Sequence, residues 1–155
     1  MASAVIVYDS WYGCTKAVAD EIARGLSGEG RIPTVVAHVK DTSPEQLLRH
    51  DVIVIGSPCH FGAPTPRIRD LLQKMRTLDL RGKRLAFFDT CFSSDRGRVT
   101  ARMETMLRNR NPFVSPPFLG LSVMVEETRG PVAPGEMGKA RDLGRTIRTS
   151  LLLSP

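Results

Sequence analysis

The chain lacks the features that mark membrane, secreted and metal-binding proteins. None of its apolar runs approaches the roughly 20 residues that a spanning helix requires, so we expect no membrane insertion. Cysteine is scarce, with three residues and no CxxC pair, which argues against a disulfide scaffold and a zinc site. The first predicted strand begins almost at Met1 and leaves no room for a signal or transit peptide. We therefore expect a cytoplasmic protein.

Several nucleotide-binding motifs are also missing. There is no G-x-G-x-x-G fingerprint of a dinucleotide site and no G-x-x-x-x-G-K-[ST] loop of a nucleotide triphosphatase. The predicted third strand is followed by Gly56-Ser57-Pro58, without the carboxylate that a phosphoacceptor response regulator needs. No basic motif is interleaved with aromatic residues, so we expect no nucleic-acid partner.

Positive charge is concentrated in one part of the chain. The net charge is +6, and residues 67–110 contain twelve basic and five acidic residues, a local net charge of +7. Such a segment attracts an acidic protein or an anionic cofactor, or it is simply a solvated surface rich in arginine. The sequence leaves these alternatives open.

Hydrophobic patterning predicts five strands that alternate with five helices. Short apolar runs predict strands over residues 4–8, 34–39, 51–55, 84–88 and 119–125. Apolar residues at helical spacing follow four of these strands, with a clear stripe at Ile68, Leu71, Leu72 and Met75. After the second strand, Ser43-Pro44-Glu45-Gln46 predicts a helix start through an N-cap and a capping box. Alternation of this kind gives a parallel sheet covered by helices on both faces. With 155 residues, we expect one domain.

Three of the predicted strands run into short loops that carry small, polar and aromatic residues. In an open parallel sheet, the loops at the carboxyl ends of the strands form the ligand site. The first loop places hydroxyls and Gly13 at a helix start, which suits a phosphate group. The other two loops offer aromatic and small polar side chains, which suit a flat ring. Together they indicate a mononucleotide-type cofactor.

At these loops the sequence resembles the flavodoxin superfamily. The segment Tyr8-Asp9-Ser10-Trp11-Tyr12-Gly13-Cys14-Thr15 fits the pattern aromatic-x-[ST]-x-x-G-x-T of its first loop. Two further segments, Ile55-Gly56-Ser57-Pro58 and Gly82-Lys83-Arg84-Leu85-Ala86-Phe87-Phe88, resemble the second loop and the lead-in to the third. The resemblance implies a three-layer fold with strand order 2-1-3-4-5 and bound FMN.

The resemblance also implies which residues hold the cofactor. They lie in three groups, one for each loop: Ser10, Trp11, Tyr12, Gly13, Cys14, Thr15 and Lys16; Ser57, Pro58, Cys59, His60, Phe61 and Gly62; Thr90, Cys91 and Phe92. Ser10 and Thr15 are expected to bind phosphate through their hydroxyls. The cysteines are interpreted as small residues that fit tight loops, with a redox-active thiol as the alternative. No metal ligand is expected.

Three functions are compatible with this resemblance. The first is an FMN protein that carries electrons between proteins and needs no catalytic side chain. Typical flavodoxins are acidic and bind basic reductases; since this chain is basic, its partner would be acidic. The second is a small NAD(P)H-dependent quinone or flavin reductase, since Tyr12-Gly13 and Pro58-x-x-Phe61-Gly62 are similar to that branch; His60 would then donate a proton. The first loop is also similar to the flavodoxin domain of flavodiiron proteins. The third is an interaction module that has lost its cofactor.

Overall fold

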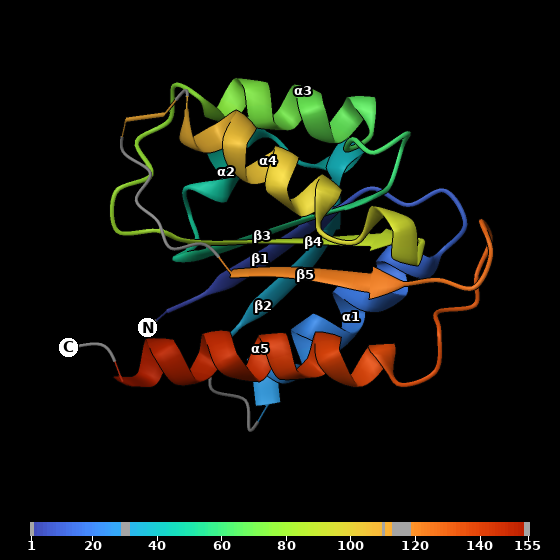
Figure 1. Ribbon diagram of the computed structural model, residues 1–155. Helices are drawn as coiled ribbons and strands as arrows, with labels where there is room; N and C mark the ends of the chain where they lie inside the picture. The colour runs from blue at the N-terminus through green and yellow to red at the C-terminus, as the bar shows by residue number, and fades with distance from the viewer. Residues whose placement is uncertain (1, 29–31, 110, 113–118, 154–155) are drawn as a thin grey trace.

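The computed structural model describes residues 2–28, 32–109, 111–112 and 119–153. Five parallel strands form one sheet in the order β2-β1-β3-β4-β5 (Figure 1). The strands are β1 (Ala4–Tyr8), β2 (Thr34–His38), β3 (Val52–Pro58), β4 (Arg84–Cys91) and β5 (Leu119–Met124). The predicted alternation and strand order are therefore confirmed.

Helices cover both faces of the sheet. On one face lie α1 (Cys14–Ser27) and α5 (Glu136–Leu153), and on the other α2 (Pro44–Leu47), α3 (Pro66–Met75) and α4 (Arg98–Arg108) (Figure 1). Two 3-10 turns, η2 (Val39–Asp41) and η3 (Ser93–Asp95), follow β2 and β4. In the part of the chain that is described, no helix combines the length and apolar character needed to cross a membrane.

The hydrophobic core has two halves, one on each face of the sheet, and β1 contributes side chains to both. Ile6 packs into the cluster with α1 and α5, and Val7 packs into the cluster with α3 and α4. Successive side chains of a strand point to opposite faces, which explains why a continuous apolar run marks this strand.

Strand ends differ from the sequence prediction in ways that shape the site. β3 and β4 extend three residues further than predicted, because Gly56, Ser57 and Pro58 pair with Phe88, Asp89 and Thr90. Thr90 and Cys91 are therefore strand residues rather than loop residues. β2 ends one residue early, at His38, where Val39 begins the 3-10 turn.

Helices α1 and α5 cross at two glycines. A Cβ atom at Gly25 would lie 2.1 Å from the carbonyl oxygen of Arg141, and one at Gly144 would lie 2.2 Å from that of Ile22. Both distances are far below van der Waals contact, so the two backbones approach as closely as they do because neither residue has a side chain. Beside this crossing, Arg141 donates to the buried Glu21 carboxylate at 3.0 Å.

Candidate functional site

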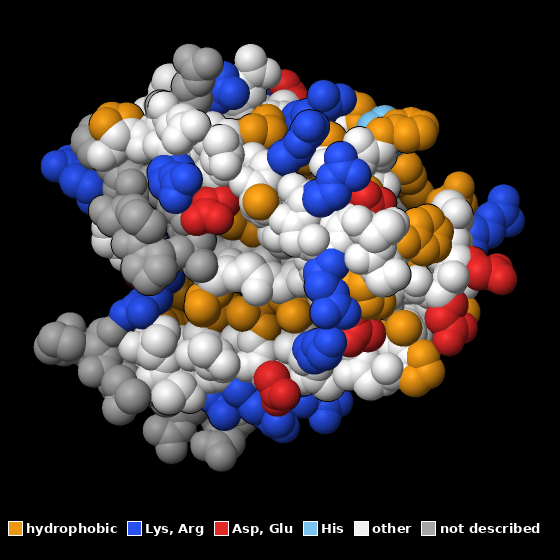
Figure 2. All heavy atoms as spheres, in the orientation of Figure 1, with side chains coloured by type: hydrophobic (Ala, Val, Ile, Leu, Met, Phe, Trp, Pro, Cys, Tyr) orange, Lys and Arg blue, Asp and Glu red, His pale blue; other side chains and the backbone are white. Residues whose placement is uncertain are grey.

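A cavity of about 490 Å³ opens at the carboxyl edge of the sheet. Small-molecule sites typically measure roughly 300–1,000 Å³, so this cavity has the right size for one. Figure 2 shows hydrophobic side chains gathered along the right-hand edge of the molecule, where β4 and β5 end in Figure 1. Most of the predicted cofactor residues line the cavity, and the exceptions are Gly13, Lys16, Ser57 and Gly62.

The first wall comes from the segment between β1 and α1 and consists of Ser10, Trp11, Tyr12, Cys14 and Thr15. Thr15 is buried, and its hydroxyl lies 3.0 Å from that of Thr90 on β4. The two hydroxyls carry two protons, and one of these forms the hydrogen bond between them. The other proton remains for a ligand, so the pair can donate a hydrogen bond into the cavity.

Gly13 and Lys16 support this wall without lining the cavity. Gly13 caps α1 with φ 92°, and its N–H donates to the Ser10 hydroxyl at 3.0 Å. The positive end of the helix dipole therefore begins beside that hydroxyl, a favourable place for an anion. Lys16 instead pairs with Asp20 at 2.9 Å, one helical turn further along α1.

The second wall follows β3 and consists of Pro58, Cys59, His60 and Phe61. His60 and Ala63 exchange two backbone hydrogen bonds, of 2.8 and 3.0 Å, across a two-residue turn. Both central residues have positive φ, 52° at Phe61 and 77° at Gly62, as in a type I′ hairpin turn. Phe61 stands at the tip of this turn and is 94% exposed.

Aromatic rings line the mouth between these two walls. The ring of His60 packs edge-on against the rings of Trp11 and Phe61, with distances of 5.1 and 4.9 Å between ring centres. Trp11, Tyr12 and Phe92 are each roughly half exposed, so apolar ring faces are open to solvent at this edge. A flat ligand ring can pack against them.

Ser57 and Gly62 shape the second loop from outside the cavity. Ser57 is fully buried; its hydroxyl accepts from the Thr65 N–H at 3.0 Å and donates to the Pro58 carbonyl at 2.8 Å. Gly62 donates its N–H to the Cys59 sulfur, and a Cβ at Gly62 would lie 2.6 Å from the guanidinium of Arg98. Their predicted contact with a cofactor stays a prediction, while the structure gives both a role in the loop itself.

The remaining lining includes three residues that the sequence analysis missed. Thr90, Cys91 and Phe92 form the predicted third wall, and Asp95 extends it. Val125 and Thr128, from the segment between β5 and α5, add a fourth. Since β5 is parallel to the other strands, the rule that points to the three loops applies equally to the segment after the fifth strand.

The fourth wall is anchored to the first. The Cys14 thiol lies 3.8 Å from the Arg129 carbonyl, and the Arg129 guanidinium lies 5.3 Å from the centre of the Tyr12 ring. Segments more than a hundred positions apart in the chain thus meet beside the start of α1.

Burial controls the ionisation of the groups behind the third wall. Asp89 is fully buried, and this burial raises its pKa to about 6. One carboxylate oxygen accepts from the Thr100 N–H at 3.1 Å and from the Ser122 hydroxyl at 3.2 Å. Among the described residues the other oxygen has no hydrogen-bond partner. Burial also raises the pKa of all three thiols, which makes them weak nucleophiles.

Asp89 should give the stability of the protein a pH dependence. Between its ordinary pKa of 3.8 and its folded value of about 6, the folded state binds more protons than the unfolded state. The contribution of Asp89 to the free energy of unfolding therefore falls as pH rises through that range. Asp89→Asn should remove it, a change of up to about 3 kcal/mol between pH 4 and pH 7, measured by urea unfolding. Asp70→Asn, on the exposed face of α3, is the control; identical pH profiles for Asp89→Asn and the unmodified protein would contradict this assignment.

Solved structures with this fold include known redox proteins. Flavodoxin 1 from Bacillus cereus superposes with a TM-score of 0.79 at 23% identity, covering 99% of this chain and 100% of that one. The rubredoxin oxygen:oxidoreductase of Desulfovibrio gigas superposes with a TM-score of 0.75 at 21% identity, covering 98% of this chain and 37% of that one. These matches establish the fold.

Curated relatives match over part of their length. The NAD(P)H dehydrogenase (quinone) of Cupriavidus metallidurans is 30% identical in an alignment of 101 residues that covers 53% of this chain and 51% of that protein. An uncharacterized protein of Methanocaldococcus jannaschii is 32% identical in an alignment of 88 residues that covers 54% of this chain and 22% of that protein. The chain thus spans about half of the first relative and about a fifth of the second. The Flavodoxin domain profile matches residues 5–115, and with this fold and this cavity the chain belongs to the flavodoxin domain family.

Proposed function

We propose that the chain binds FMN in this cavity and carries electrons between redox partners. The observation that carries the proposal is the pairing of two chemistries in one cavity. The start of α1, with the hydroxyls of Ser10 and Thr15, suits a phosphate, and the rings of Trp11 and His60 suit an isoalloxazine. Bound FMN supplies the redox chemistry, while this chain binds and orients it.

FMN fits this chain better than FAD. The first wall offers one helix N-terminus and lacks the glycine fingerprint that accommodates a pyrophosphate. The test is chromatography of the cofactor extracted from purified protein, together with calorimetric titration of the apoprotein with FMN. Recovery of FAD, or no measurable FMN binding, would overturn the proposal.

A reductase is the second candidate, and the similarity to an NAD(P)H dehydrogenase (quinone) favours it. In that case His60, which lines the cavity, would donate a proton to the reduced acceptor. Addition of NADH or NADPH under anaerobic conditions separates the two candidates. A flavin absorbance that pyridine nucleotide bleaches supports the reductase, and an unchanged absorbance supports the carrier. A module without cofactor is the third candidate, and the buried hydroxyl pair of Thr15 and Thr90 argues against it.

If the chain is a carrier, association with an acidic partner should weaken as salt rises. Arg67 and Arg69 are exposed near the start of α3, directly after the second wall, and surface attraction is screened beyond about 8 Å at physiological ionic strength. Arg67→Glu and Arg69→Glu should each slow association roughly tenfold and leave FMN affinity unchanged. Arg145→Glu on α5, on the other face of the sheet, is the matched control. Stopped-flow association rates that change neither with salt concentration nor with these charge reversals would favour the reductase. Arg110, the last basic residue of the segment, lies outside the described residues.

A further inference from the structure

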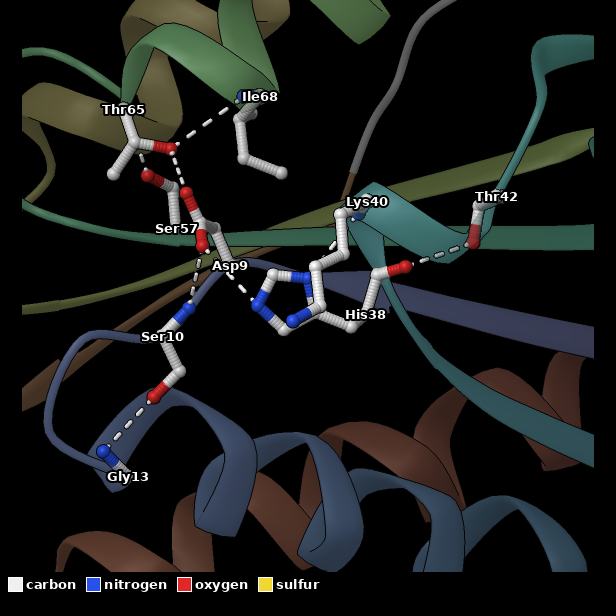
Figure 3. A network of polar contacts seen from close by, with 9 residues as sticks. All are labelled: Asp9, Ser10, Gly13, His38, Lys40, Thr42, Ser57, Thr65 and Ile68. Carbon is white, nitrogen blue, oxygen red and sulfur yellow. Dashed lines mark hydrogen bonds and ion pairs between the residues drawn. The ribbon is translucent and has the colours of Figure 1, made fainter.

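Behind the first wall, the buried carboxylate of Asp9 joins three separate elements (Figure 3). One oxygen accepts from the Ser10 N–H at 2.9 Å and lies 3.4 Å from Nε2 of His38 at the end of β2. The other oxygen accepts from the Thr65 hydroxyl at 2.7 Å. Asp9 itself does not line the cavity, and these three contacts are made within the protein.

Thr65 extends this contact to the second wall. It is the N-cap of α3, where its hydroxyl accepts from the Ile68 N–H at 3.5 Å, and its own N–H donates to the Ser57 hydroxyl at 3.0 Å. Ser57 and Thr65 therefore close the base of the loop that carries His60 and Phe61. Through Thr65, Asp9 holds both ends of this loop.

His38 holds the carboxylate from the opposite side. Its Nδ1 accepts from the Lys40 N–H at 3.2 Å, which places a proton on Nε2, the atom that faces Asp9. The ring also packs edge-on against Tyr8 at 5.2 Å, so its orientation is fixed. A buried carboxylate with three donors is stable in one orientation, and Asp9 can act as a rigid connection.

We propose that Asp9 is a positioning residue that sets the distance between the phosphate part and the ring part of the cofactor site. The proposal rests on the proposed function, that the cavity takes FMN. Asp9 is bonded to Ser10 in the first wall and, through Thr65, to the loop of the second wall. The two parts of one cofactor would bind to walls whose spacing this carboxylate fixes.

The spacing matters because FMN must engage both parts at once. When one part of a ligand is bound, the effective concentration of the other part depends on how well the two subsites match its length. If the walls become free to shift, each subsite still works alone, but their combined benefit is lost. Riboflavin, which has no phosphate, uses the ring subsite alone. Trp11 of that subsite belongs to the first wall and His60 and Phe61 to the second, so riboflavin should respond to the spacing less than FMN does.

Asp9→Asn is the direct test. An amide has one acceptor oxygen, which can keep Ser10 and His38. Its N–H group can then only donate to the Thr65 hydroxyl, so a charge-assisted bond is replaced by a weaker neutral one and the Thr65 proton loses its acceptor. We expect at least a tenfold loss of FMN affinity, about 1.4 kcal/mol, with a riboflavin affinity changed less than about twofold. The matched control is Glu21→Gln, which removes another buried carboxylate, between α1 and α5, and should leave both affinities unchanged.

Thr65 supplies a second and milder pair of variants. Thr65→Val removes the hydroxyl and should repeat the Asp9→Asn effect, while Thr65→Ser keeps it and should retain FMN affinity. Equal losses for FMN and riboflavin in Asp9→Asn and Thr65→Val, or full FMN affinity in Thr65→Val, would overturn the proposal.

Amide hydrogen exchange of the apoprotein tests the connection without any cofactor. The Ser10 N–H donates to Asp9, so its exchange should become about tenfold faster in Thr65→Val and stay unchanged in Glu21→Gln. An unchanged Ser10 exchange in Thr65→Val would show that the walls are not coupled. If the unmodified protein binds no FMN, the proposed function fails by itself, and the exchange measurement still decides whether Asp9 couples the two walls.

Discussion

Gly144→Ala should lower the free energy of unfolding by at least about 3 kcal/mol, because overpacking of this severity forces two helices apart. The new Cβ would lie 2.2 Å from the Ile22 carbonyl oxygen and 2.8 Å from the Leu26 nitrogen, both on α1. These are backbone atoms and cannot rotate away. Since native domains are stable by about 5–15 kcal/mol, such a loss would leave a marginal protein.

The same helix provides a control for this substitution. Gly138 lies in the first turns of α5 with no atom within 4 Å of its hypothetical Cβ. Gly138→Ala should therefore stabilise the helix, by up to about 1 kcal/mol, through helix propensity alone. Urea unfolding measures both variants. A Gly144→Ala midpoint equal to that of the unmodified protein would show that the crossing is looser than the structure indicates.

The double variant Ser10→Ala with Thr15→Ala should weaken FMN binding at least a hundredfold, since hydrogen bonds to a charged group contribute roughly 1.5–3 kcal/mol each. Ser10 and Thr15 line the cavity beside the start of α1, where the phosphate is proposed to bind. Riboflavin affinity should change less than about threefold, because riboflavin lacks that group. Fluorescence titration of the apoprotein with each flavin gives both constants.

A second double variant controls for the loss of hydroxyls in general. Ser27→Ala with Thr34→Ala removes one serine and one threonine hydroxyl that bond to nearby carbonyls, at the end of α1 and at the start of β2. It should leave both affinities unchanged. If the Ser10 and Thr15 variant lost FMN and riboflavin equally, its hydroxyls would not be at the phosphate.

The order of strands and helices could be predicted because each strand is marked by a short apolar run. β1 is buried along its whole length, so Val5, Ile6 and Val7 had to be apolar on both faces. The strand ends could not be predicted in the same way. Gly56 and Pro58 have low strand propensity, yet pairing with β4 extends β3 through both of them. The Phe88 ring also packs directly on Gly56, because a Cβ there would lie 2.0 Å from it.

The cavity was predictable where its walls follow from topology, and less so where they depend on individual contacts. Three walls lie where parallel strands end, and the fourth, with Val125 and Thr128, obeys the same rule but carries no distinctive residues. Ser57 is buried outside the cavity because its hydroxyl accepts from the N–H of Thr65, eight positions further along the chain, and no local pattern reveals this contact. Lys16 is the opposite case, because Asp20 stands four positions further along the helix and the ion pair could have been read from that spacing.

Two of the three cysteines give this protein native chemical probes. Cys14, Cys59 and Cys91 belong to three different walls, and Cys91 is the most deeply buried of them. Burial raises the pKa of all three thiols and keeps them largely unreactive at neutral pH. Cys91 is also closed to a reagent, so alkylation at alkaline pH followed by mass spectrometry would report the first and second walls through Cys14 and Cys59. Any ligand that fills the cavity should shield Cys14 and Cys59 together, whereas a molecule that touches one of these two walls should protect one thiol. The site can thus be footprinted by alkylation of native residues, without any engineered cysteine.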